Sequence, residues 1–186
     1  MLTLTRHFAA TRKGAQPRKP ATELVRYAFG DSSIGKVLIA CTDQGLRALR
    51  LAPESESRAL AELRQNLSGA ELVADRSVAG PVLEAIDDYL AGRPTADLEL
   101  DLRGTPFQRR VWQEIRKIPH GQTITYTELA RRAGKPRAVR AAGSACGKNS
   151  IGILVPCHRV LAKDGGLGGY GGGLSVKEKL LEIEAG

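Results

Sequence analysis

The chain has 186 residues and a formal net charge of +8, with 42% hydrophobic residues and 4% aromatic ones. This supply of aliphatic side chains is enough for a folded core, which argues against a globally disordered chain. No apolar run reaches the length of a membrane-spanning helix, and three scattered cysteines form no disulfide framework, so a reducing, cytoplasmic setting is expected.

The first hundred residues are expected to contain a basic arm followed by a small scaffold domain. Residues 1–20 carry five basic groups and no acidic one, without the apolar segment of a secretory signal, so we expect a disordered arm. Turn-rich segments then separate three strand-like runs, which predict an antiparallel meander at 24–29, 34–41 and 46–51. Periodicity predicts two helices and a closing short strand, at 55–67, 81–90 and 98–102. We assign residues 21–102 to this N-terminal domain.

Residues 103–186 are expected to form a second, mainly helical domain. Helix-start signals occur at Thr105, Thr125 and Ser175, each followed three residues later by Gln or Glu. They predict helices at 106–117, 126–133 and 176–184. A further helix at 137–148 follows a short turn containing glycine, so it and the preceding helix have the shape of a helix-turn-helix. The glycine-rich run 165–173 predicts a loop, with phosphate binding as the weaker alternative.

Basic side chains are concentrated in this second domain. Residues 103–163 hold thirteen basic groups against two acidic ones, which is typical of a surface that binds a polyanion. A solvated, solubilising face is the alternative. The segment 137–146 has mostly very small side chains, so its backbone can approach a narrow minor groove with one Arg inserted. Tight packing in the core is the alternative there, although Arg137, Arg140 and Lys148 argue against complete burial.

Cys157 is the candidate nucleophile. It follows an apolar, strand-like run at 151–155 and Pro156, and it precedes His158 and Arg159. Cationic neighbours lower the pKa of a thiol and so increase the thiolate fraction, which is the reactive form. Because neighbours in an extended segment point to opposite faces, coupling between Cys157 and His158 is expected to run through water.

The other cysteines and the histidines indicate no second site. Cys41 lies within a strand-like run and Cys146 on the small-residue helix, so both are expected to be buried apolar residues. A zinc site is disfavoured because the sequence has no Cys-x-x-Cys pair and its three histidines are widely spaced. We therefore predict neither a metal nor a cofactor.

Five stretches of the second domain resemble one known family. They are Gly-Thr-Pro-Phe-Gln at 104–108, Thr-Tyr-Thr-Glu-Leu-Ala at 125–130, Ala-Val-Arg-Ala at 138–141, Pro-Cys-His-Arg-Val at 156–160 and Gly-Tyr at 169–170. With these motifs, the second domain closely resembles the catalytic domain of O6-alkylguanine-DNA alkyltransferases, also called methylated-DNA–protein-cysteine methyltransferases. The likeness is greatest to the C-terminal half of Ada-type proteins. The first domain resembles the family's variable N-terminal domain more loosely.

The resemblance implies an α+β fold and a DNA repair activity. The N-terminal domain would be a small antiparallel sheet with helices, ribonuclease H-like, and the C-terminal domain a mainly helical, winged-helix-like unit with a helix-turn-helix. The protein would transfer the alkyl group of O6-alkylguanine, with O4-alkylthymine as a further candidate, irreversibly to Cys157 in a single turnover. Its partner would be double-stranded DNA, which it would bind in the minor groove. It would act as a monomer in the cytoplasm, on the nucleoid, without membrane contact.

The same resemblance implies roles for individual side chains. Cys157 would accept the alkyl group, and His158, polarised by Glu184, would remove the thiol proton through a bound water. Tyr126 would assist base flipping and give a proton or hydrogen bond to the departing guanine. Arg140 would be a finger that fills the gap left by the flipped nucleotide.

Further positions are implied to contact DNA or the flipped base. Beside the Arg140 finger, the DNA contacts on the same helix would be Arg137, Ala141 and Ser144. The base pocket would be lined or braced by Asn149, Val155, Val160 and Tyr170, with Asn149 holding the turn of the active site.

The sequence also departs from the family pattern. Ser150 stands where a proline often follows the asparagine, and Gly171 replaces a serine found after the pocket tyrosine in some members. The cysteine-rich zinc domain of full Ada proteins is not in the sequence, so regulation through an alkylated zinc site is not expected. Two other classes remain open: a non-catalytic alkylated-base binder, which would lack Cys157, and a winged-helix regulator, which would not need it.

Overall fold

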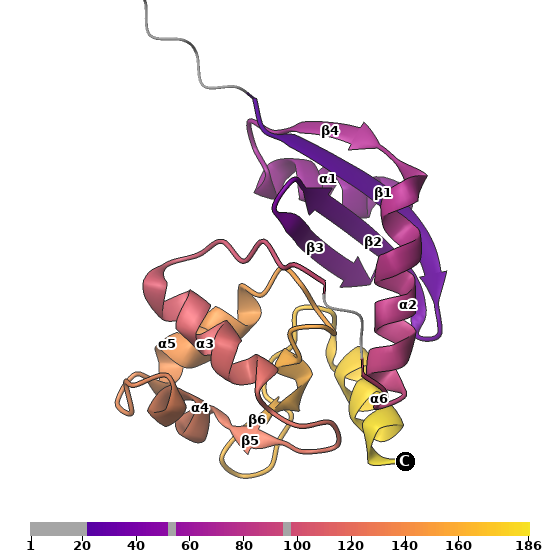
Figure 1. The fold of residues 1–186 in the computed structure, drawn as a ribbon. Coiled ribbons are helices and arrows are strands. Elements are labelled where there is room, and N and C mark those ends of the chain that lie inside the picture. Colours follow the sequence, from indigo (N-terminus) through magenta and orange to yellow (C-terminus); the bar gives the residue numbers. More distant parts are fainter. Residues whose placement is uncertain (1–21, 52–54, 95–97) are drawn as a thin grey trace, which may run out of the picture.

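A computed structural model of the protein describes residues 22–51, 55–94 and 98–186. The basic arm expected at residues 1–20 lies outside these ranges. Within them, none of the helices has both the length and the apolar character needed to cross a membrane. The fold is α+β, with an N-terminal sheet flanked by helices and a mainly helical C-terminal part (Figure 1).

The N-terminal sheet has the strand order β3-β2-β1-β4. Its strands are β1 (Leu24–Ser32), β2 (Gly35–Thr42), β3 (Gly45–Leu51) and β4 (Glu71–Ala74). The expected meander is present, because β2 is antiparallel to both β1 and β3. The sequence reading missed β4, which adds a parallel edge beside β1. Only Leu72 of its four residues is even half-buried, so the strand has no alternating pattern that could reveal it.

Strand β2 carries apolar side chains on both faces, and a helix covers each face. The flanking elements are α1 (Glu56–Asn66), the 3-10 turn η1 (Arg76–Val78) and α2 (Ala79–Leu90). Val37 and Ile39 pack in the same core cluster as α2, whereas Leu38 and Ala40 pack with Leu63 of α1. Because successive strand residues point to opposite faces, α1 and α2 lie on opposite sides of the sheet (Figure 1).

The strand expected at 98–102 is reduced to one isolated bridge, between Leu100 and Leu46. Leu46 N donates to the Glu99 carbonyl over 2.8 Å. At the neighbouring Gly45 the backbone φ is +118°, and a Cβ atom there would lie 2.2 Å from the Glu99 oxygen. The segment 98–102 therefore packs against the start of β3 at a point where only glycine fits, and it forms no further strand pairing.

Residues 103–186, all of them described, fold into four α-helices and two short strands. The elements are α3 (Pro106–Arg116), β5 (Ile124–Thr125), α4 (Tyr126–Arg132), α5 (Val139–Gly147), the 3-10 turn η2 (Cys157–Arg159), β6 (Val160–Leu161) and α6 (Leu174–Ala185). The strands β5 and β6 pair in parallel. Helices α4 and α5 form the expected helix-turn-helix, with α5 beginning at residue 139 instead of 137.

Two helices begin with the expected threonine caps. Thr105 accepts a hydrogen bond from Gln108 N, and the Gln108 side chain accepts one from Thr105 N, which completes a capping box. Thr125 accepts from Glu128 N over 3.2 Å, but the Glu128 carboxylate pairs with two arginines of its own helix. The first of these caps is therefore reciprocal, as predicted, and the second is one-sided.

The start of α6 differs from the prediction. The capping box expected at Ser175 is wrong, because the helix already begins at Leu174. The preceding Gly173 has φ +92° and makes no side-chain cap, since it has no side chain. The glycine-rich run 165–173 is a loop, as expected, and it delivers the chain into α6 in a conformation that favours glycine.

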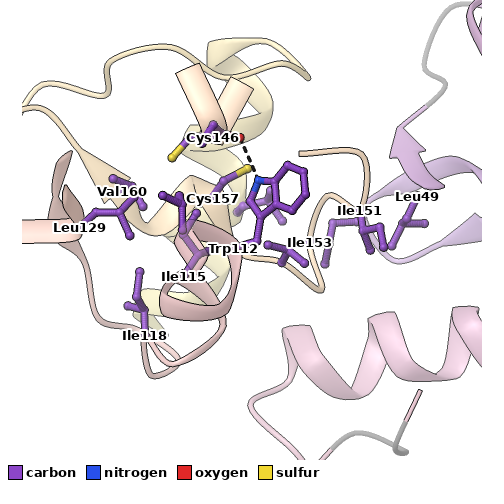
Figure 2. Close-up of a cluster of buried hydrophobic side chains, with 14 of the residues drawn as sticks. Leu49, Trp112, Ile115, Ile118, Leu129, Cys146, Ile151, Ile153, Cys157 and Val160 are labelled. Atoms are coloured by element: carbon purple, nitrogen blue, oxygen red, sulfur yellow. Dashed lines mark hydrogen bonds between the residues drawn. The ribbon is translucent and has the colours of Figure 1, made fainter. Parts of the chain in front are cut away.

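One hydrophobic core joins the two parts of the molecule. Trp112 of α3 packs in the same cluster as Leu49 of β3, and its Nε1 donates to the Ala145 carbonyl over 2.9 Å (Figure 2). The backbone also crosses the junction: Leu49 N donates to Ser150 O at 2.9 Å, and Gly152 N donates to Leu49 O at 3.0 Å. The segment that leads into η2 is therefore fastened to the end of the sheet.

Candidate active site

The candidate nucleophile lies on the 3-10 turn η2, behind a tight turn. The strand-like run expected at 151–155 is not a strand: only Ile151 makes a bridge, to β3, and the chain then turns. Ile153 has φ +69°, an uncommon conformation for a β-branched residue. Its side chain is buried, as is that of Val155, because the turn crosses the core. Cys157 itself is 8% exposed.

Asn149 ties this turn to the thiol. Its Nδ2 donates to the Val155 carbonyl at 2.8 Å and to Cys157 Sγ at 3.3 Å. Its Oδ1 accepts from Ile151 N at 3.0 Å. One side chain thus fixes both ends of the turn and holds the sulfur in place.

His158, Arg159 and Glu184 form a buried polar network. Glu184 Oε1 lies 2.7 Å from His158 Nε2, and the Arg159 guanidinium donates to both carboxylate oxygens at 2.7 and 2.9 Å. Arg159 also donates to the Ile118 carbonyl at 2.6 Å. Helix α6 delivers the carboxylate to η2, so the structure brings His158 and Glu184 together.

The protonation states of this network leave one lone pair available. Burial raises the pKa of Glu184, but the hydrogen bonds from His158 and Arg159 outweigh it and hold that pKa at about 2. Burial lowers the pKa of His158, so the ring is neutral at neutral pH. An ionised carboxylate only accepts, so Nε2 carries the ring proton and Nδ1 the lone pair. Nδ1 is buried without a hydrogen-bond partner among the described residues.

The thiol needs such a base. Burial raises the pKa of Cys157, and the Asn149 hydrogen bond and the charge of Lys177 lower it only in part. The group therefore rests as a thiol at neutral pH, and the neutral imidazole of His158, the next residue in the chain, is a base that can take its proton.

Lys177 supplies the charge that the sequence reading assigned to Arg159, and that assignment was wrong. Arg159 is committed to Glu184, whereas Lys177 is the cation whose charge lowers the thiol pKa. Lys177 is fully buried, and its Nζ donates to the carbonyls of Val160 and Leu167 at 2.6 and 2.5 Å. The sequence feature that could have indicated this role is a single lysine on the apolar side of the last helix.

Cys157 lines a cavity of about 230 Å³ between the two parts of the molecule. Of the expected pocket residues, Asn149 and Tyr170 line it, whereas Val155 and Val160 are fully buried and do not. Sequence reasoning missed residues of the cavity wall that come from β3, α1 and α5: Leu49, Arg50, Leu51, Glu62 and Cys146. No local sequence pattern shows which side chains of the N-terminal sheet face the C-terminal part of the molecule.

Two tyrosines, Tyr126 and Tyr170, lie close to the candidate active site. The Tyr126 hydroxyl donates to the Gly169 carbonyl at 3.3 Å, and burial raises its pKa, so it stays protonated at neutral pH. A Cβ at Gly168, where φ is +65°, would come within 2.9 Å of the Tyr126 ring, so glycine lets the loop pass this close. The Tyr170 ring lies edge-on to that of His158, with centroids 6.5 Å apart. Tyr126 does not line the cavity itself.

Helix α5 presents one exposed face beside the site. Its inward residues, Ala142, Ala145 and Cys146, are buried in the core. The residues that the sequence assigned to DNA are exposed in or just before this helix: Arg137, Arg140, Ala141 and Ser144. No described residue forms an ion pair with either arginine. Small side chains and unpaired cations together suit close contact with a polyanion.

The remaining cysteines form no second reactive site. Cys41 is half-buried in β2, and Cys146 is buried on α5, where burial raises its pKa to about 12. Over the three described ranges, no cluster of His, Cys, Asp and Glu could hold a metal ion.

Two family models match the chain. Residues 25–103 match the ribonuclease-like domain of 6-O-methylguanine DNA methyltransferase, and residues 106–186 match its DNA binding domain.

Known proteins and structures give the same family. The chain is 43% identical to the methylated-DNA–protein-cysteine methyltransferase of Mycolicibacterium paratuberculosis, over 87% of this chain and 93% of that protein. It is 42% identical to the bifunctional transcriptional activator/DNA repair enzyme Ada of Escherichia coli, but it spans only 46% of Ada. The crystal structure of Mycobacterium tuberculosis OGT in complex with DNA matches with a TM-score of 0.70 and 40% identity, covering 87% of this chain and 92% of that one.

Proposed function

Because this chain belongs to the 6-O-methylguanine DNA methyltransferase family, we propose that it repairs O6-alkylguanine in double-stranded DNA by moving the alkyl group to Cys157. The observation that carries the proposal is the lone pair on His158 Nδ1. That nitrogen is buried next to the thiol-bearing residue and is oriented by the Glu184 carboxylate on the other side of the ring. O4-alkylthymine is a second candidate substrate.

The proposed reaction is one displacement. The Cys157 proton passes to His158 Nδ1, directly or through one water molecule, and the resulting thiolate is stabilised by the charge of Lys177. The sulfur attacks the alkyl carbon, so a C–S bond forms and the C–O6 bond breaks with its electron pair on the guanine. Tyr126, protonated at neutral pH, offers the departing base a hydrogen bond or proton. The thioether is stable, so each molecule acts once.

On the DNA side, α5 would lie in the minor groove. The base has to leave the stack to reach a nucleophile that is only 8% exposed. Arg140, exposed and unpaired among the described residues, would fill the gap, while Arg137, Ala141 and Ser144 would contact the backbone and groove.

The cavity beside Cys157 would hold the flipped base. Asn149 and Tyr170 support this role because both line the cavity. Val155 and Val160 would contribute only through their main chain and from beneath the wall. We also propose a division into a scaffold of residues 21–102 and an alkyltransferase domain of 103–186, acting as a cytoplasmic monomer.

Intact mass measurement after mixing with duplex DNA that contains O6-methylguanine tests the proposal. We expect a gain of one methyl group, located by peptide mapping on Cys157, and no gain with unmodified DNA. Tight binding of the lesion without a mass gain would instead indicate a non-catalytic binder. Binding that ignores the lesion but depends on the surrounding sequence would indicate a regulator.

A further inference from the structure

A second cavity, of about 160 Å³, lies where β3 meets the end of α5. Four cationic side chains line it: Arg47, Arg50, Arg103 and Lys148. Among the described residues that line it, none carries a carboxylate. The cavity thus gathers four cations at the junction of the two parts of the molecule, and the rest of its wall is Ala48, Leu63, Asn66, Leu67 and Ser150.

Two of these cations already have acidic partners. Arg103 donates to Asp101 over 2.9 Å and also pairs with Glu23. Arg50 lies 3.8 Å from a Glu62 oxygen, which is a loose ion pair. Their charges are therefore balanced outside the cavity.

Arg47 has no such partner. Its Nη1 donates to Ser150 Oγ at a long 3.4 Å, and its Nε is buried without a hydrogen-bond partner among the described residues. Burial lowers the pKa of this guanidinium, and Asp101 and Glu23 act on it only through longer-range attraction. A guanidinium held by one long hydrogen bond and by no ion pair with the described residues keeps donor capacity for a ligand that brings acceptor oxygens.

Lys148 is the second uncommitted cation. It is exposed at the C-terminal end of α5 and makes no ion pair or side-chain hydrogen bond with the described residues. Positions 141, 144 and 148 follow helical spacing, so Lys148 continues the exposed face of α5 just past its last residue. The cavity therefore lies where that face ends.

The junction that holds these groups is firmly built. Ser150 Oγ donates to the Arg47 carbonyl at 3.1 Å, and the neighbouring Leu49 and Ile151 form a bridge. The backbone segments that carry Arg47 and Lys148 are consequently held together before any ligand arrives.

We propose that this cavity binds a phosphate group, and that in the DNA complex the phosphate belongs to the strand that passes the C-terminal end of α5. The assignment to DNA rests on the proposed function. Contact with DNA would then extend beyond the helix-turn-helix to β3 of the N-terminal sheet. An arginine held by one long hydrogen bond and a lysine without an ion pair among the described residues, both lining one pocket, provide donors that a phosphodiester accepts.

The test measures how duplex binding depends on salt for the full chain with Arg47→Gln, Lys148→Gln and both together. The matched control is Arg76→Gln, an exposed arginine beyond β4 at the opposite edge of the sheet. Unmodified duplex DNA is used, so the result does not depend on alkyl transfer. We expect the plot of log K against log salt to be less steep for the double variant, with a slope smaller in magnitude by about one, as for one lost phosphate contact. Between 50 and 200 mM salt, the wild type would then lose about fourfold more affinity than the double variant.

Inorganic phosphate provides the second arm. It should raise the melting temperature of the wild type and of Arg76→Gln more than that of the double variant. Protection by phosphate with an unchanged DNA slope would overturn the DNA assignment and leave a site for a free anion. No difference in either measurement would overturn the site itself. If Arg47→Gln fails to fold, the exposed Lys148→Gln still decides the matter by its slope. A failed methyl gain at Cys157 would leave this result unaffected, so the two proposals fail separately.

Discussion

At the scale of single residues, the reactivity of Cys157 comes from its neighbours, since burial alone raises the pKa of the thiol. Cys157→Ala should therefore abolish alkyl transfer, with duplex binding near that of the wild type because the exposed face of α5 is unchanged. Intact mass reports the transfer, and fluorescence anisotropy reports the binding. Cys41→Ala, outside the cavity, is the matched control. A methyl group found on Cys41 or Cys146 in the Cys157→Ala variant would contradict the assignment.

His158 and Glu184 should behave as one unit, because the carboxylate fixes which ring nitrogen carries the lone pair. Glu184→Gln and His158→Ala should each slow single-turnover transfer, by about 10²–10⁴ for loss of the base. The double variant should be little slower than the poorer single one. Glu182→Gln, exposed on the same helix, is the control. Fully additive losses would mean that Glu184 only holds α6 in place.

Glu184 should also make the free energy of unfolding depend on pH in the acidic range. Its pKa is about 2 in the folded protein against an ordinary 4.5, so the unfolded chain binds a proton more readily. Its contribution to stability is therefore complete above pH 4.5 and is lost as the pH falls toward 2. Denaturant unfolding at several pH values should show a steeper decline for the wild type than for Glu184→Gln in this window. Parallel curves for the two proteins would contradict the prediction.

At the scale of helices and strands, the sequence predicts those elements whose ends are set by nearby turn and capping residues. Turn residues predict the meander, and a threonine cap followed by a short turn that contains glycine predicts the helix-turn-helix. The sequence does not predict β4, because a four-residue edge strand has little buried surface and forms only beside β1. The strand expected at 151–155 is apolar because the turn crosses the core, not because it pairs.

The same limit applies to the site. Adjacency in sequence indicates Cys157 and His158, and the resemblance to the family adds Glu184. Which cation acts on the thiol depends on the docking of α6, which brings in Lys177 and turns Arg159 toward Glu184. The cavity wall from β3 depends in the same way on contacts between parts far apart in sequence.

A prediction for helix α5 distinguishes two roles of Arg140: filling the gap left by the flipped base, or contacting a phosphate. Arg140→Ala should slow transfer from duplex DNA because the extruded state loses the group that fills the gap. Transfer from the free base O6-benzylguanine, which needs no flipping, should change much less. Arg137→Ala is the comparison: it should weaken binding to every duplex and recover at low salt. Recovery of Arg140→Ala at low salt would remove the finger assignment and keep the alkyltransferase function.

At the scale of the whole molecule, the N-terminal part supports the candidate active site through Arg159. Tyr89 of α2 lies under the Arg159 guanidinium, 4.8 Å from ring centroid to Cζ, and Arg159 in turn holds Glu184. Tyr89→Ala should lower the free energy of unfolding by about 3 kcal/mol and slow transfer. Tyr89→Phe keeps the ring and removes a buried hydroxyl that has no described partner, so it should be close to neutral in both. Equal effects of the two substitutions, measured by denaturant unfolding and single-turnover rates, would refute this link.

Helix α6 follows every other element of the fold and carries both Lys177 and Glu184. A ribosome therefore releases the rest of the fold before the two groups that make Cys157 reactive. Until α6 has been synthesised and packed, Cys157 has neither the oriented base nor the buried cation beside it, so it lacks the groups that assist alkyl transfer in the folded protein. Packing of α6 against η2 is then the folding step that makes Cys157 competent for alkyl transfer.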